Sequence, residues 1–117
     1  MLSFSGRLKV FLAVKPCDLR KSFNGLHALV SGSLGEDPHQ GALFVFCNRR
    51  RTRLKVLYWD GTGLWVLMKR LEKGTFWWPD ASELGFSKLQ LSPGAFGMLT
   101  DGIDLRGATM RPWYGRD

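Results

Sequence analysis

The strongest constraint on the fold of this chain is a β-hairpin predicted in its middle. Residues 53–60 alternate in character, with Leu54, Val56 and Tyr58 on one face, as in a half-buried strand. An Asp-Gly-Thr-Gly turn follows at once, and its glycines adopt positive φ at little cost. Residues 64–72 would then return beside residues 53–60. Their apolar spacing fits helix or strand, but the tight turns on both sides favour a strand.

A helix is predicted over residues 18–31, after a first strand over residues 8–14. Apolar residues recur at spacings of three and four between Leu19 and Val30, which matches one face of a helix. Asp18 stands where a capping residue is needed.

The unbroken apolar run at residues 42–47 predicts a strand covered on both faces. Residues 75–79 are expected to follow 64–72 as the next strand of an antiparallel meander, which Pro79 closes. The remaining predicted elements are a brief strand at 88–91 and a short helix that Ser92 caps and that ends near Leu99.

Together these elements predict a single α+β domain over residues 1–107, followed by a loose tail at 108–117. Its core would be an antiparallel β-sheet of four or five strands with one longer helix packed on it and a short C-terminal helix. The chain of 117 residues with 44% hydrophobic content is long enough for one buried core. No apolar run reaches the roughly 18 residues that span a bilayer, so a cytoplasmic protein without membrane contact is expected.

Cysteine and histidine usage predicts no cofactor, metal or disulfide. Cys17 and Cys47 are far apart and lack a C-x-x-C partner, so they are interpreted as idle thiols. His27 and His39 are isolated in the sequence, one in a helical pattern and one in a loop, which makes metal ligation by either unfavoured.

Positive charge is concentrated in one segment. Residues 48–77 hold eight basic and two acidic residues, a net charge of +6 against +7 for the whole chain. The densest part, which a hairpin scaffold would present, consists of Arg49, Arg50, Arg51, Arg53 and Lys55. Local basic charge of this kind indicates a polyanionic partner, with nucleic acid as the first candidate and a solvated loop as the alternative.

The order of several motifs resembles a known family. These are P-x-D-L-R-K-S-F-x-G-L at 16–26, G-x-L-F-V-F-C-N-R-R-R-x-R-L-K at 41–55, Y-W-D at 58–60, K-R-L-E-K-G at 69–74, W-P at 78–79 and D-G-I-D at 101–104. The pattern is similar to the small accessory protein, the second-open-reading-frame product or TnpB, of bacterial insertion sequences of family sixty-six. Thr75 and Trp77 depart from it, since relatives often carry basic residues there.

The resemblance implies a non-catalytic accessory role in DNA transposition beside a separate transposase. DNA and that transposase are the expected partners, and the resemblance leaves open whether the protein forms a homo-oligomer. Candidate nucleic-acid-binding residues are Arg49, Arg50, Arg51, Arg53, Lys55, Arg20, Lys21, Lys69 and Arg70. Arg20 could instead pair with Asp18 or Asp60. The alternative function is a protein-interaction module that binds the transposase without touching DNA.

Aromatic and acidic residues offer two further functions, and each has a simpler structural explanation. Four tryptophans, at positions 59, 65, 77 and 78, could stack on unpaired bases, but at least half are expected in the core. A small metal-dependent nuclease is disfavoured, because that chemistry needs carboxylates that converge on a cation. The available acids are scattered among turns and caps: Asp18, Asp60, Glu72, Asp101 and Asp104.

Overall fold

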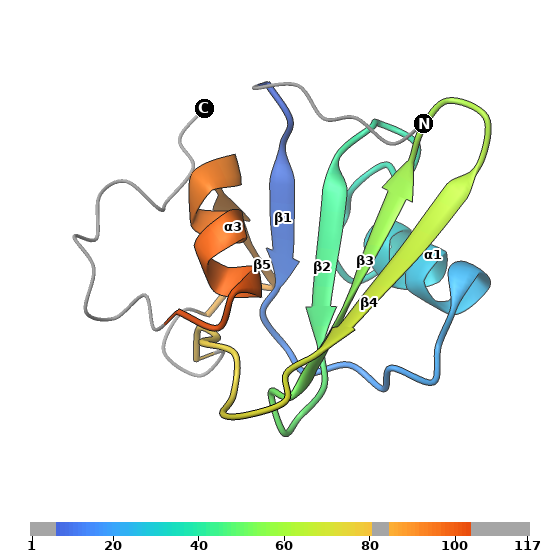
Figure 1. The fold of residues 1–117 in the computed structure, drawn as a ribbon. Helices are drawn as coiled ribbons and strands as arrows, with labels where there is room; N and C mark the ends of the chain where they lie inside the picture. Colours follow the sequence, from blue (N-terminus) through green and yellow to red (C-terminus); the bar gives the residue numbers. More distant parts are fainter. Residues whose placement is uncertain (1–6, 81–84, 104–117) are drawn as a thin grey trace.

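A five-stranded β-sheet organises the chain, with one helix against each face (Figure 1). The computed structural model describes residues 7–80 and 85–103. The strands lie in the order β4-β3-β2-β1-β5. Their bounds are β1 Val10–Ala13, β2 Leu43–Cys47, β3 Arg53–Trp59, β4 Leu64–Arg70 and β5 Lys88–Leu91, and the helices are α1 Phe23–Ser31 and α3 Pro93–Thr100.

The sheet is mixed, so the prediction of a purely antiparallel sheet is wrong. β1 runs parallel to β2, with Val10 opposite Leu43, while the other three pairs of neighbours are antiparallel. The physical reason is the crossover between β1 and β2. A strand, a helix and a returning strand place neighbouring strands in the same direction, which a tight hairpin cannot do.

Residues 75–79 do not form the predicted last strand of the meander. The chain leaves β4 and turns under the sheet, where the Phe76 amide donates a hydrogen bond of 2.7 Å to the Arg51 carbonyl oxygen. Phe76 and Trp78 are buried, and Trp78 Nε1 donates to the Ala13 carbonyl oxygen at 2.9 Å. Burial of these large rings in the core takes the segment away from the outer edge of β4, where another strand would pair.

Two separate apolar clusters fill the faces of the sheet. The alternation predicted in β3 is confirmed, because Leu54 and Val56 join the cluster on the α3 face and Leu57 joins the cluster on the α1 face. Every residue of β2 is buried, as its unbroken apolar run predicts. The helices supply Leu26 and Val30 from α1 and Ala95 and Leu99 from α3.

The first helix starts later than the sequence predicts. Ser22, and not Asp18, occupies the N-cap of α1, and the nine residues of α1 scarcely exceed the eight of α3. Asp18 is engaged elsewhere, because its carboxylate accepts the Arg20 amide at 3.0 Å. The predicted cap of α3 is confirmed, since the Ser92 hydroxyl accepts the Ala95 amide. No helix within the described ranges has the length and apolar character that a membrane crossing requires.

Candidate nucleic-acid interface

The basic loop between β2 and β3 is held in one conformation by Asn48. Its side-chain oxygen accepts the amides of Thr52 and Arg53 at 2.9 and 3.1 Å, and its side-chain nitrogen donates to the Thr52 hydroxyl. The Asn48 carbonyl oxygen also accepts the Arg51 amide at 3.0 Å. Sequence reasoning did not single out Asn48, although an asparagine at the entrance of a short turn is a usual turn-forming residue. The arginines therefore project from a fixed scaffold.

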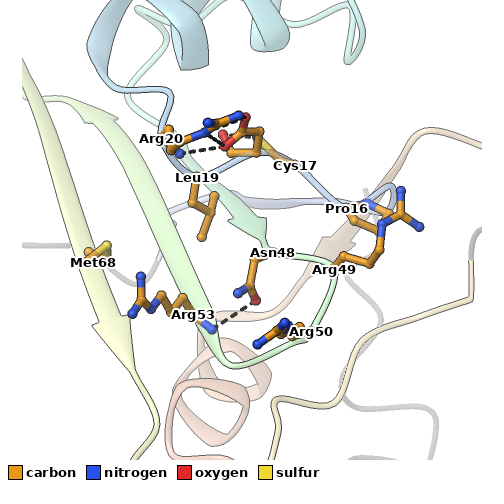
Figure 2. A pocket seen from close by; sticks show the side chains of 10 residues that line it. Pro16, Cys17, Leu19, Arg20, Asn48, Arg49, Arg50, Arg53 and Met68 are labelled. Carbon is orange, nitrogen blue, oxygen red and sulfur yellow. Dashed lines mark hydrogen bonds and ion pairs between the residues drawn. The ribbon is translucent and has the colours of Figure 1, made fainter.

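Part of this loop borders a hollow of about 480 Å³ (Figure 2). Arg49, Arg50 and Arg53 line one side, and the segment that leads to α1 lines the other side with Arg20. The two sides are fixed together at the ends of parallel strands β1 and β2, where the Cys17 amide donates to the Cys47 carbonyl oxygen at 2.8 Å. Tertiary folding thus brings an arginine from residues 16–20 beside arginines that come much later in the chain.

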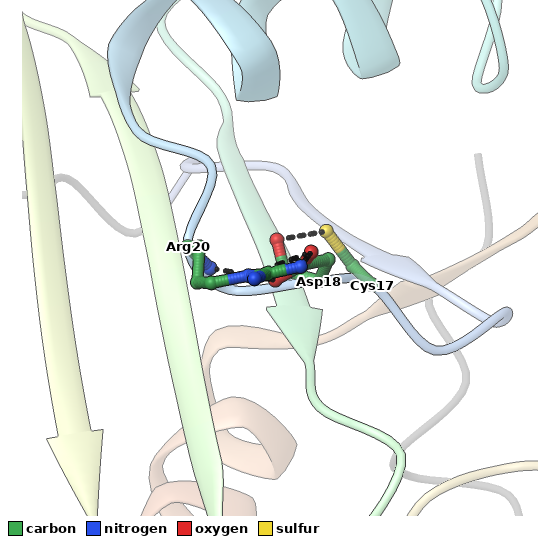
Figure 3. Close-up of polar contacts among 3 residues, drawn as sticks. All are labelled: Cys17, Asp18 and Arg20. Atoms are coloured by element: carbon green, nitrogen blue, oxygen red, sulfur yellow. Dashed lines mark hydrogen bonds and ion pairs between the residues drawn. The ribbon is translucent and has the colours of Figure 1, made fainter.

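The electrostatic character of the hollow is cationic. Within the described part of the chain, no ion pair involves Arg49, Arg50 or Arg53. Arg20 lies 2.7 Å from an oxygen of Asp18, which is the first of its two expected pairings (Figure 3). Hydrogen bonds from the Arg20 side chain lower the pKa of Asp18 to about 2, so this carboxylate stays ionised near neutral pH. Among the residues that line the hollow, one acid therefore accompanies four guanidinium groups.

Five of the candidate residues do not line this hollow: Arg51, Lys55, Lys21, Lys69 and Arg70. Arg51 occupies the left-handed region with φ 60°. The Lys55 ammonium donates to the Lys21 carbonyl oxygen at 2.8 Å and thus holds the chain just before α1. Lys21 itself lines a second hollow, of about 230 Å³, which shares Pro16, Cys17 and Asp18 with the first. The structure thus gives Lys55 a structural partner and places Lys21 in the lining of a different hollow.

Lys69 and Arg70 in β4 point to opposite faces of the sheet, as neighbours in a strand do. Lys69 reaches the C-terminal end of α3, where its ammonium donates to the Thr100 carbonyl oxygen at 2.6 Å and lies 4.0 Å from Asp101. Arg70 lies opposite Arg53 on β3 and 3.4 Å from Glu72. Of this pair, only Arg70 extends the positive charge near the hollow.

The aromatic candidates are divided between the core and the surface. Trp78 is buried, and Trp77 packs against the same cluster. Trp59 is half-buried, with its ring 4.5 Å from that of His39, while Trp65 is 41% exposed.

The two histidines are isolated in the sequence but not in the fold. The Nε2 atoms of His27 and His39 lie 3.3 Å apart. This contact joins α1 to the loop before β2, and the sequence pattern did not predict it.

The carboxylates of the described residues do not form a metal cluster. No group of three or more His, Cys, Asp or Glu side chains in those ranges is arranged to hold a cation. Asp60 holds the β3–β4 turn, because it accepts the amides of Thr62 and Gly63 and the indole Nε1 of Trp65. These hydrogen bonds, that of Trp65 first, keep the pKa of Asp60 well below its usual range. Asp104 lies outside the described residues.

The two thiols are poor nucleophiles, and only that of Cys17 lines the hollow. Burial raises the pKa of Cys47 to about 12, and burial also raises the pKa of Cys17. Both cysteines are free, and each thiol is therefore protonated near neutral pH.

Comparison with known proteins identifies one family and two similar proteins. A family model described as "IS66 Orf2 like protein" matches residues 8–110. The uncharacterized protein y4jC of Sinorhizobium fredii is 38% identical over 96% of this chain and 93% of its own length. The uncharacterized protein y4hO of the same organism is 36% identical, over 91% of this chain and 90% of its own length. No solved structure gives a significant match. The chain belongs to the IS66 Orf2-like family, whose members have an accessory role in transposition.

Proposed function

We propose that this protein assists transposition by binding DNA through the arginine-lined hollow, beside a separate transposase that carries out the chemistry. The observation that supports this most directly is the convergence of Arg49, Arg50 and Arg53 on one hollow without an acidic partner among the described residues. Membership in the IS66 Orf2-like family provides the biological setting.

The chemistry of arginine favours phosphate as the group that fills this hollow. A guanidinium group presents several N–H donors in a plane, and these match pairs of phosphate oxygens. Positive charges held close together repel each other, and an anion between them relieves that repulsion. Because Asn48 fixes the loop, little conformational entropy is lost when the phosphate binds. Such interactions bind DNA of any sequence and weaken as salt increases.

A pair of matched double variants tests the proposal. Arg49→Ala/Arg50→Ala removes two charges at the hollow, and Arg7→Ala/Lys9→Ala removes two charges next to the start of β1, at the opposite end of the sheet (Figure 1). Both variants lower the net charge from +7 by the same amount. DNA affinity is measured by fluorescence anisotropy over a series of salt concentrations.

The hollow variant is expected to bind DNA more weakly and with a shallower salt dependence. The slope of log K against log salt concentration should fall by about 0.9 for each phosphate that the variant no longer neutralises. The control variant should keep nearly the slope of the original protein. Equal weakening by both variants would mean that only net charge matters. Unchanged binding by the hollow variant would show that the hollow is not the DNA-binding site.

A further inference from the structure

We infer that the outer edge of β4 is a self-association surface, which pairs antiparallel with β4 of a second copy of this chain. β4 is a strand of seven residues at the edge of the sheet, and among the described strands its single neighbour is β3. Three of its apolar side chains are exposed: Trp65 by 41%, Leu67 by 38% and Met68 by 58%. A long apolar edge of this kind is a template for another strand.

The hydrogen bonds at the two ends of β4 show which of its backbone groups point outward. The Asp60 amide donates to the Gly63 carbonyl oxygen, and the Leu71 amide donates to the Thr52 carbonyl oxygen. In an antiparallel pair only alternate residues bond to the neighbouring strand, so the odd-numbered residues of β4 face β3. The outward-facing groups therefore belong to Leu64, Val66, Met68 and Arg70. Within the described residues these groups have no hydrogen-bond partner.

The usual protection of such an edge is missing from the middle of β4. Natural edge strands are often guarded by lysine or proline, which discourage pairing. Here the charges of the strand lie at one end, and each has a partner within its own copy. Lys69 donates to the Thr100 carbonyl oxygen of α3, and Arg70 lies beside Glu72. The central residues Val66, Leu67 and Met68 are uncharged.

One antiparallel register gives a hydrogen-bond partner to every outward-facing backbone N–H and C=O group of both strands. It is centred on Leu67, which meets Leu67 of the second copy, and it pairs Val66 with Met68. Leu64 then lies opposite Arg70, and Trp65 opposite Lys69. This register is complementary in charge, because the Asp60 carboxylate is held at Trp65 Nε1 at 2.8 Å. The basic end of each strand therefore approaches an aromatic ring and an acid on the other copy.

Such a dimer would continue the sheet across a two-fold axis perpendicular to it. The α1 faces of both copies would then lie on the same side. Met68 of β4 borders the arginine-lined hollow, so the two hollows would open on one face near the axis. Self-association does not depend on DNA binding, and either can fail without the other.

The first experiment measures the mass of the full chain in solution. Sedimentation equilibrium over about 1 to 100 µM protein should show a concentration-dependent species of twice the 13.3 kDa monomer mass. Leu67→Lys places two like charges opposite each other and should raise the dissociation constant at least about tenfold. Phe86→Lys is the matched control, because Phe86 is an exposed apolar residue, 54% accessible, just before β5 at the other edge of the sheet.

The second experiment tests the register. Residue 67 is expected to form a non-hydrogen-bonded pair with itself, whose Cα atoms lie about 4.5 Å apart, close enough for a disulfide. Leu67→Cys in a Cys17→Ser background should therefore give a covalent dimer on oxidation, while Phe86→Cys should not. The inference is overturned if the protein stays monomeric at about 100 µM, the highest concentration of the sedimentation series. Equal effects of Leu67→Lys and Phe86→Lys, or cross-linking through Phe86→Cys alone, also overturn it.

Discussion

At the scale of single residues, Arg51 adopts a backbone conformation that is easier for glycine than for other residues. Its φ of 60° lies in the left-handed region, where a side chain with a Cβ atom costs about 1–2 kcal/mol. Glycine would adopt this conformation without that cost. The loop nevertheless keeps an arginine there, and the neighbouring hydrogen bonds to Asn48 and Phe76 hold it in place. The position combines a strained backbone with an exposed positive charge.

Two substitutions of Arg51 should therefore differ in stability. Arg51→Gly is expected to change the free energy of unfolding by less than about 1 kcal/mol, because relief of strain offsets the greater entropy of the unfolded chain. Arg51→Val should destabilise the protein by about 1–2 kcal/mol more, since a β-branched residue fits the left-handed region poorly. Denaturant midpoints measure the difference. Equal stability of the two variants would contradict this account of the loop.

The ion pair between Glu36 and Lys88 should make stability depend on pH. Both side chains are mostly shielded from solvent, and Lys88 and Gln40 together lower the pKa of Glu36. Its contribution is therefore complete above the ordinary glutamate pKa of 4.5 and is lost as pH falls through the lower folded value. Glu36→Gln is expected to cost about 1–2 kcal/mol at pH 7, and this cost should diminish steadily as pH falls below 4.5.

The matched control is Glu72→Gln, which breaks an exposed pair with Arg70. Exposed pairs contribute little, so this change should stay within about 0.5 kcal/mol. Thermal or urea unfolding at several pH values measures both variants. A loss of stability in Glu36→Gln that does not diminish in acid would show that the carboxylate charge is not its cause.

At the scale of elements, α3 is attached to the sheet by a narrow apolar face. Leu99 is fully buried against the cluster that contains Trp78, whereas the adjacent Met98 is 36% exposed. The helix has only eight residues, too few to be stable alone. Tertiary packing must therefore supply most of its stability.

Alanine at these two neighbouring positions tests that packing. Leu99→Ala should reduce the free energy of unfolding by about 2–4 kcal/mol, because it removes buried methyl groups and leaves a cavity. Met98→Ala should change it by less than about 1 kcal/mol, since alanine also favours the helix. Urea unfolding gives both values. Similar losses of stability at the two positions would mean that α3 does not pack through Leu99.

At the scale of the whole molecule, most basic and acidic side chains lie in different places. Basic side chains gather at the end of the sheet where β2 turns into β3, and Asp18 is the one carboxylate that lines the hollow there. Asp60 holds the β3–β4 turn, and Glu36 pairs with Lys88. Metal-dependent phosphoryl transfer needs acids that meet at one cation. No such group of acids is found among the described residues. Under the proposed function, the protein binds DNA and the separate transposase cleaves it.

Incubation with supercoiled plasmid and magnesium or manganese should therefore leave the DNA intact. Asp60 is committed to the β3–β4 turn through its hydrogen bonds with Thr62, Gly63 and Trp65, so it is a poor metal ligand. The assay follows conversion of supercoiled to nicked plasmid. Nicking that co-elutes with the protein and disappears in Asp60→Asn or Asp101→Asn would place the protein among nucleases.

The sequence alone determined much of the local structure, although not the course of residues 75–79 or the start of α1. Alternation in residues 53–60, the glycine turn after them and the apolar run at 42–47 indicated β3, the β3–β4 turn and β2, because side-chain periodicity and turn chemistry act between near neighbours. The motif order likewise indicated the family.

Only the tertiary structure decided the direction of β1, the burial of Phe76 and Trp78, and the partners of the basic residues. Each depends on segments far apart in the chain, since β1 pairs with β2 across α1 and Lys55 reaches the Lys21 carbonyl oxygen. Arg20 and Arg49 are likewise distant in the sequence, and packing of parallel strands brought them to one hollow. Long-range contacts of this kind arise from packing of the whole chain, which no local pattern records.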